Sequence, residues 1–160
     1  MRVAQVAVFA KAPIPGFAKT RLIPLLGPEG AAGCHAQMVR RALTIASASG
    51  AAPSLWQAGD AAHPFWAEMG DAFGCPQYPQ TGDDLGARMA HALGALHHHQ
   101  HPVVLIGSDC PALTADHLRS AVAALAARGV PVLCWTIRSA DHEAAARRVA
   151  ANITFEGYAP

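Results

Sequence analysis

A chain of 160 residues, of which 52% are hydrophobic and 14% charged, can bury a sizeable core, and this composition excludes a disordered protein. Its net charge of +1 gives the molecule as a whole no attraction for nucleic acid or for an anionic membrane surface. No apolar run reaches the length of a membrane span, and the first residues carry no convincing cleavage site, so we expect a cytoplasmic protein.

The first predicted elements are a buried strand over residues 3–9 and a basic loop over residues 11–21. The strand is an almost continuous apolar run, which is typical of a strand near the middle of a sheet. The loop carries the cations Lys11, Lys19 and Arg21, and its prolines and glycine stiffen and turn the chain. Open α/β sheets build anion sites beyond their strand ends, so the loop is predicted to bind nucleotide phosphates. Ordinary solvated surface charges are the alternative.

Helices and strands then alternate along the chain. A helix is predicted from Pro28 to about Ser47, followed by a strand over residues 53–57, a short helix over 62–73 and a short extended segment over 75–80. The aromatic residues of the second helix are expected in the core. This alternation favours a three-layer α/β fold with a mostly parallel sheet.

Glycines and acids precede a predicted helix over residues 81–98. Thr81 or Asp83 could cap this helix, and apolar residues repeat every four positions from Leu85. The acids could simply complement the helix dipole, or the loop could let the backbone approach a base or a sugar. The residue pattern favours neither alternative.

A second apolar run, over residues 103–107, leads directly into Ser108 and Asp109 and then a helix over 114–128. An acid at the carboxyl end of a central strand lies where α/β sheets place ligand groups. Asp109 is therefore predicted to hold Mg²⁺ or Mn²⁺ beside the substrate phosphates. The alternative is that its side chain caps the turn.

The cysteines and histidines do not form a convincing metal site. Four cysteines lie far apart without a CxxC pair, which favours reduced, mostly buried thiols at Cys34, Cys75, Cys110 and Cys134. The histidines of residues 97–101 are predicted at a solvated helix end, because consecutive helical residues point in different directions.

Three segments together resemble a bacterial family of small GT-A-like transferases, labelled DUF2064. In chain order they read FAKAPIPG with KTRL (residues 9–16 and 19–22), DLGARM (84–89) and IGSDCPAL (106–113), so that the resemblance covers roughly residues 1–125. It implies a nucleotide-diphosphosugar transferase fold, an NTP or nucleotide-sugar donor and a divalent metal. By this resemblance Asp109 would bind the metal and act in catalysis with Lys19. The substrate would contact Lys11, Pro13, Gly16, Lys19, Thr20, Arg21, Asp84, Leu85, Gly86 and Ser108.

Residues 129–160 depart from that family. They read as strand, helix and strand over about 130–137, 144–151 and 153–158, without the Asp-Gly-Gly-Tyr segment that the family carries. This tail resembles the end of glycerophosphodiester phosphodiesterases, but their catalytic His-Arg-Gly opening is absent. We therefore expect one α/β domain over residues 1–160, with residues 1–128 transferase-like and an atypical tail packed on the same core.

The leading hypothesis is a nucleotidyl- or glycosyltransferase that binds an NTP or a nucleotide-sugar and acts on an acceptor that the sequence does not identify. A nucleotide-binding module with impaired catalysis is the second hypothesis, and a relative of the phosphodiesterases is the third. Neither nucleic acid nor a membrane is an expected partner, and a homodimer is left open.

Overall fold

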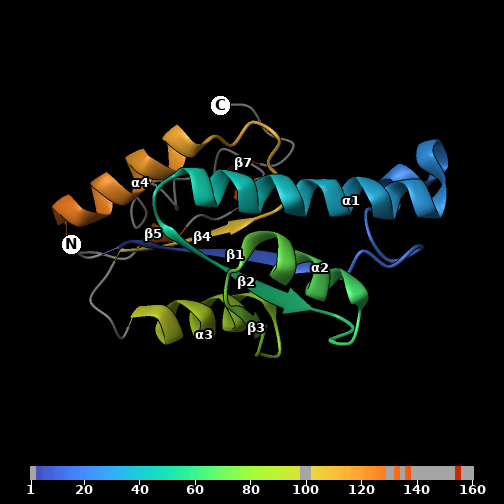
Figure 1. Ribbon diagram of the computed structural model, residues 1–160, viewed down its shortest axis with the longest axis horizontal. Helices are drawn as coiled ribbons and strands as arrows, with labels where there is room; N and C mark the ends of the chain where they lie inside the picture. Colours follow the sequence, from blue (N-terminus) through green and yellow to red (C-terminus); the bar gives the residue numbers. More distant parts are fainter. Residues whose placement is uncertain (1–2, 98–101, 129–131, 134–135, 138–153, 156–160) are drawn as a thin grey trace.

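The computed structural model describes residues 3–97, 102–128, 132–133, 136–137 and 154–155. A parallel sheet lies at its centre, with five strands in the order β3-β2-β1-β4-β5 (Figure 1). In chain order these strands are β1 (Gln5–Lys11), β2 (Ala52–Ala58), β3 (Gln77–Pro79), β4 (Val103–Gly107) and β5 (Val132–Leu133). Every neighbouring pair runs parallel, which confirms the predicted α/β class.

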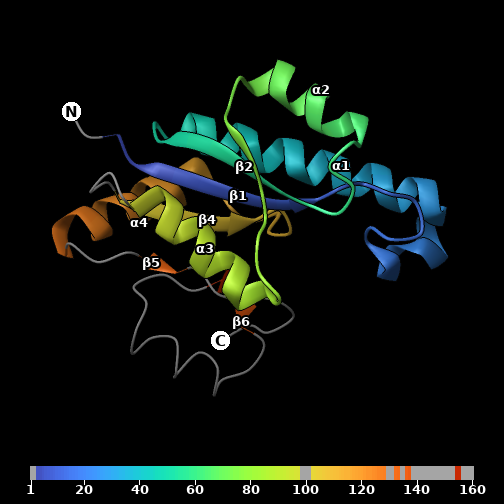
Figure 2. The same ribbon diagram turned by 90° about the horizontal axis from the view of Figure 1, so that it is seen from below.

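Helices cover both faces of the sheet and complete the three predicted layers. Figures 1 and 2 show one face under α1 (Ile23–Ala48), α2 (Pro64–Phe73) and α4 (Ala115–Arg128), and the other under α3 (Leu85–His97). A hydrophobic core lies on each face of the sheet. Alternate residues of β1 contribute to these two cores, because successive side chains of a strand point to opposite faces. Val6 and Val8 pack with α1, whereas Ala7 and Phe9 pack with α3.

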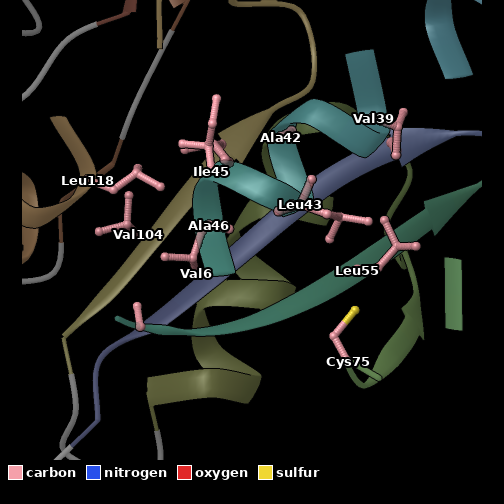
Figure 3. Packing of buried hydrophobic residues seen from close by; sticks show 14 of the residues in the cluster. Val6, Val39, Ala42, Leu43, Ile45, Ala46, Leu55, Cys75, Val104 and Leu118 are labelled. Atoms are coloured by element: carbon pink, nitrogen blue, oxygen red, sulfur yellow. The ribbon is translucent and has the colours of Figure 1, made fainter. Parts of the chain in front are cut away.

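Among the described helices, α1 makes the most extensive contact with the central strands β1 and β2. Leu43 is fully buried, and Val39, Leu43 and Ala46 lie over Val6 and Leu55 (Figure 3). This regular part is preceded by a break at Gly27, where the backbone leaves helical geometry with φ 70° and ψ 169°. The regular helix therefore begins at Pro28, as the sequence predicts.

The start of α3 differs from the sequence prediction. Neither Thr81 nor Asp83 caps this helix; Asp84 does, because its Oδ1 accepts a hydrogen bond from the Ala87 backbone N–H at 2.7 Å. Gly82 has φ 145°, a backbone conformation that L side chains rarely adopt. A Cβ at this position would lie 2.7 Å from the Arg88 backbone nitrogen. The chain thus turns tightly before the helix begins.

The described parts of the tail belong to two sheets. β5 pairs with β4, whereas β6 (Thr136–Ile137) pairs in parallel with β7 (Thr154–Phe155). The prediction of one continuous strand over residues 130–137 is therefore wrong for the described residues. The predicted helix over 144–151, the histidines after residue 97 and Cys134 lie outside the described residues. None of the described helices has the length and apolar character needed to cross a membrane.

Candidate functional site

The carboxyl ends of the central strands bring the predicted site residues to one edge of the sheet. β1 and β4 are adjacent and parallel, with Phe9 opposite Gly107. The basic loop leaves β1 at Lys11, and Asp109 follows β4 after one intervening residue. Figure 1 shows the loop running from the end of β1 to the first turns of α1. Strand pairing alone therefore places the loop near Asp109.

The basic loop has a defined shape. Phe17 donates its backbone N–H to the Ile14 carbonyl at 3.0 Å, and Gly16 takes φ 83° inside this turn. A proline followed by a glycine with positive φ is typical of a type II turn. The loop then ends in a short 3-10 helix, η1 (Thr20–Leu22), before α1.

A cavity of about 220 Å³ lies where the loop meets the end of β4. It contains all three cations of the loop together with the predicted acid. Its described lining is Lys11, Phe17, Lys19, Thr20, Arg21, Leu22, His35 and Asp109. We call this cavity the basic pocket.

Lys19 and Asp109 form an ion pair inside the basic pocket. The Lys19 Nζ lies 2.6 Å from Asp109 Oδ1, and Ser108 Oγ donates to the same oxygen at 3.2 Å. Burial alone would raise the pKa of the Asp109 carboxyl group, but the hydrogen bond and charge of Lys19, with Ser108, outweigh it and hold that pKa below its usual value. Asp109 is therefore ionised and bound to Lys19 rather than serving as a turn cap.

Lys19 is held in an unusual backbone conformation. It has φ 51° and ψ 46°, and among the described residues it is the sole non-glycine residue with positive φ. Left-handed backbone costs an L-residue about 1–2 kcal/mol, so the surrounding structure must hold it in place. Ala18, next to it, is fully buried, and the Lys19 side chain itself is only 19% exposed. The ammonium group is thus fixed at the pocket wall.

His35, on α1, is a pocket residue that the sequence analysis missed. It is 3% exposed, and its Nε2 lies 2.9 Å from the Lys11 carbonyl oxygen. Burial lowers the pKa of His35, so the ring is neutral near pH 7. The signal in the sequence is its position one helical turn before Val39, on the buried face of the helix.

Several predicted substrate residues lie outside the described lining of the basic pocket. Pro13 and Gly16 belong to the loop's turn region, and Ser108 lines a separate cavity of about 30 Å³ under α1. Asp84 is engaged as the cap of α3, and Gly86 lies in its first turn. Leu85 is 63% exposed. The segment 84–86 still belongs to the same edge of the sheet, because the preceding Gln80 side chain donates to the Ala10 carbonyl at 3.2 Å.

The donor set in the described lining of the basic pocket does not fit a preformed divalent-metal site. No group of three His, Cys, Asp or Glu residues suited to a metal occurs among the residues that the structure describes. Asp109 is the one carboxylate in the described lining, and its Oδ1 already binds an ammonium group. Mg²⁺ and Mn²⁺ therefore stay a prediction from the sequence. The described thiols of Cys34, Cys75 and Cys110 are free.

Comparisons with known proteins agree with this architecture. A solved structure from Desulfovibrio desulfuricans G20, described as a "putative nucleotide-diphospho-sugar transferase", matches with 30% identity and a TM-score of 0.69. The match covers 79% of this chain and 55% of the other, so this chain spans little more than half the length of that protein. No curated protein matches the chain.

The family comparison matches residues 41–137, which is more than half of the chain. The match extends past residue 125, where the resemblance in the sequence ended, and reaches into the atypical tail. The basic loop precedes the matched residues. The resemblance of the tail to phosphodiesterases stays a prediction. With this match, the chain belongs to the family described as "Uncharacterized protein conserved in bacteria (DUF2064)".

Proposed function

We propose that the protein is a glycosyltransferase that binds a nucleotide-sugar through its diphosphate group in the basic pocket. The observation that carries this proposal is the convergence of Lys11, Lys19 and Arg21 on one cavity at the carboxyl ends of the central strands. Cations gathered at this edge of an α/β sheet suit the phosphates of a nucleotide. The similarity to the solved transferase-like structure supports the same class of ligand.

The pocket can lower the barrier of such a transfer by stabilising the leaving group. When the sugar is transferred, the bond between its anomeric carbon and the diphosphate oxygen breaks, and the electron pair stays on that oxygen. Lys19 and Arg21 would stabilise the charge that builds there. The acceptor forms the new bond to the anomeric carbon and releases its proton to water. Asp109 acts by holding Lys19 in place.

The segment that follows β3 would supply the other end of the donor site. Residues 84–86 lie at the edge of the sheet that carries the basic pocket, and Leu85 exposes an apolar side chain there. An exposed leucine at such an edge can pack against the face of a nucleobase. Asp84 and Gly86 would shape the backbone around it.

A nucleotidyltransferase is the second candidate. The same cations would stabilise pyrophosphate as it leaves a nucleoside triphosphate.

A binding module without catalysis is favoured by one observation, namely that the carboxylate in the described lining is already paired with Lys19 and is not free to act as a base.

Product analysis separates these functions. The full chain would be incubated with UDP-, GDP- and ADP-sugars and with nucleoside triphosphates, in the presence of simple acceptors, and released nucleoside diphosphate or pyrophosphate would be measured. Arg21→Met should reduce release of nucleoside diphosphate, whereas Arg40→Met should leave it unchanged, because Arg40 pairs with Glu68 away from the pocket. If a nucleotide or nucleotide-sugar raises the melting temperature but neither nucleoside diphosphate nor pyrophosphate is released, only the binding module remains as a candidate function.

A further inference from the structure

We propose that Lys19, held by Asp109, takes the place of a divalent metal ion, so that the basic pocket binds a diphosphate group without a metal. This inference rests on the proposed function, because it assumes that a nucleotide's diphosphate occupies the pocket. It follows from the way the Asp109 carboxylate is used and from the charges around it.

One oxygen of the carboxylate that a metal would need is already engaged. Lys19 Nζ and the Ser108 hydroxyl share Oδ1 of Asp109, at 2.6 and 3.2 Å. Mg²⁺ binds carboxylate oxygens at about 2.0–2.1 Å. A Mg²⁺ ion on this oxygen would therefore lie close to the ammonium group, and the two positive charges would repel each other. Metal binding at Oδ1 would require Lys19 to leave.

Lys19 is poorly placed to leave. Its side chain is 19% exposed, against 60% for Asp109, and its backbone is held in the left-handed region. A lysine on a free loop would lose side-chain entropy when it binds a phosphate, but this lysine is already ordered before the ligand arrives. The ammonium group is thus a preorganised cation beside the anion site, which is the role that a bound metal usually fills.

The net charge of the described lining matches a nucleotide-sugar without further neutralisation. The described lining holds three cations, Lys11, Lys19 and Arg21, and one carboxylate, while burial keeps His35 neutral. Two positive charges remain. The diphosphate of a nucleotide-sugar carries about two negative charges, one on each phosphate, whereas a triphosphate carries about four near neutral pH. The charge balance therefore favours the nucleotide-sugar as a metal-free ligand.

Calorimetric binding to the full chain tests the inference. The probes are inorganic pyrophosphate, UDP-glucose, GDP-mannose and ADP-glucose, each in EDTA and in excess MgCl₂ or MnCl₂. For the wild type we expect affinities that agree within about threefold between EDTA and metal. Lys19→Met should lower affinity at least about tenfold in both buffers, because a charge-assisted hydrogen bond is lost.

Asp109→Asn distinguishes a holder of Lys19 from a metal ligand. The amide oxygen can still accept from Lys19, and the variant removes a negative charge from an anion site, so affinity in EDTA should rise by about two- to threefold. Asp116→Asn is the matched control, since Asp116 is an exposed acid on α4 that pairs with Arg119. It should leave affinity unchanged. Thermal melting of each variant confirms that it is folded.

Each outcome decides between the alternatives. If metal raises wild-type affinity about tenfold or more and Asp109→Asn removes that gain, the metal-free inference is wrong while the proposed function survives. If pyrophosphate binds in EDTA but none of the nucleotide-sugars binds in either buffer, the pocket does bind a diphosphate group without a metal, and the proposed function fails. If no probe binds in either buffer, both are overturned.

Discussion

The Nε2 atom of His35 lies 2.9 Å from the carbonyl oxygen of Lys11, and this contact joins the buried face of α1 to the last residue of β1. A carbonyl oxygen can only accept, so Nε2 carries the hydrogen. The other ring nitrogen, Nδ1, is buried and has no hydrogen-bond partner among the described residues. His35 therefore fixes the point at which the basic loop leaves the sheet, and we regard it as a positioning residue.

The first prediction compares two replacements of His35. His35→Leu removes the donor and leaves a partly buried carbonyl oxygen unpaired, which should cost about 1–3 kcal/mol of unfolding free energy. It should also lower pyrophosphate affinity, because the loop loses its anchor. His35→Gln can place an N–H near the same oxygen and should restore most of that affinity. Chemical denaturation and calorimetry measure the two effects. Equal losses of affinity in both variants would show that the hydrogen bond does not position the loop.

The second prediction concerns the dependence of stability on pH. Burial lowers the pKa of His35 in the folded state from the ordinary value of 6.5. As pH falls below about 6.5, the unfolded chain takes up a proton that the folded chain refuses, so the unfolding free energy decreases. His35→Gln lacks this group, and its stability relative to the wild type should therefore improve as pH falls from about 7.5 to 5. Denaturant melts across that range test the sign of the change.

Asp109 should contribute in a separate, more acidic window. Its folded-state pKa is lowered from 3.8, so the stability that its ion pair with Lys19 provides is present above about pH 4 and is lost as pH falls further. Because the Asp109 side chain is 60% exposed, solvent screens this contribution and it should be small. The difference in unfolding free energy between the wild type and His35→Gln over about pH 7.5 to 5 therefore reports on His35 rather than on Asp109.

Much of the fold could be predicted because its signals are local. The apolar runs predicted β1, β2 and β4 to within a few residues, and Pro28 marked the beginning of the regular helix. The placement of the basic loop and of Asp109 beyond the carboxyl ends of two strands could be predicted as well, because α/β sheets carry their ligand groups there. These features need only periodicity and a general rule of sheet topology.

The features that escaped prediction depend on contacts between distant segments. The position of His35 on the buried face of its helix can be read from the sequence, but its role cannot, because its partner is a backbone carbonyl at the end of β1 that no side chain reveals. Asp84 was missed as a cap because Asp83 is an equally good candidate and only the backbone turn at Gly82 decides between them. The single strand over residues 130–137 was a wrong prediction because β5 and β6, although close in sequence, pair with different strands.

The third prediction concerns Arg41, which secures the loop that carries Asp109. Its Nη2 donates to the Pro111 carbonyl at 2.9 Å and to the Leu113 carbonyl at 3.3 Å, so α1 is tied to the segment after β4. Arg41→Met should cost about 1 kcal/mol of unfolding free energy and weaken pyrophosphate binding severalfold, because the segment after β4, which forms one wall of the basic pocket, is no longer fixed against α1. Denaturation and calorimetry provide both values.

A matched control for Arg41 lies at the preceding position of the same helix. Arg40 pairs with Glu68 of α2 and has no contact with the loop after β4 among the described residues. Arg40→Met removes the same charge, so it should leave pyrophosphate affinity unchanged. If Arg40→Met lost as much pyrophosphate affinity as Arg41→Met, the positive charge of α1 would explain the loss. The two hydrogen bonds from Arg41 to backbone carbonyls would then not matter for binding.

The last prediction separates the structural role of Asp84 from the proposed role of Leu85 in binding a base. Asp84→Ala removes the cap of α3 and should cost about 1 kcal/mol of unfolding free energy, whereas Asp84→Asn keeps a good cap and should cost little. Leu85→Ser changes an exposed side chain, so stability should change by less than about 0.5 kcal/mol. If Leu85 packs on the base, this variant should weaken UDP-glucose or GDP-mannose binding severalfold and leave pyrophosphate binding unchanged. An equal effect on pyrophosphate would place Leu85 with the phosphates instead, and no effect on either would remove residues 84–86 from the donor site.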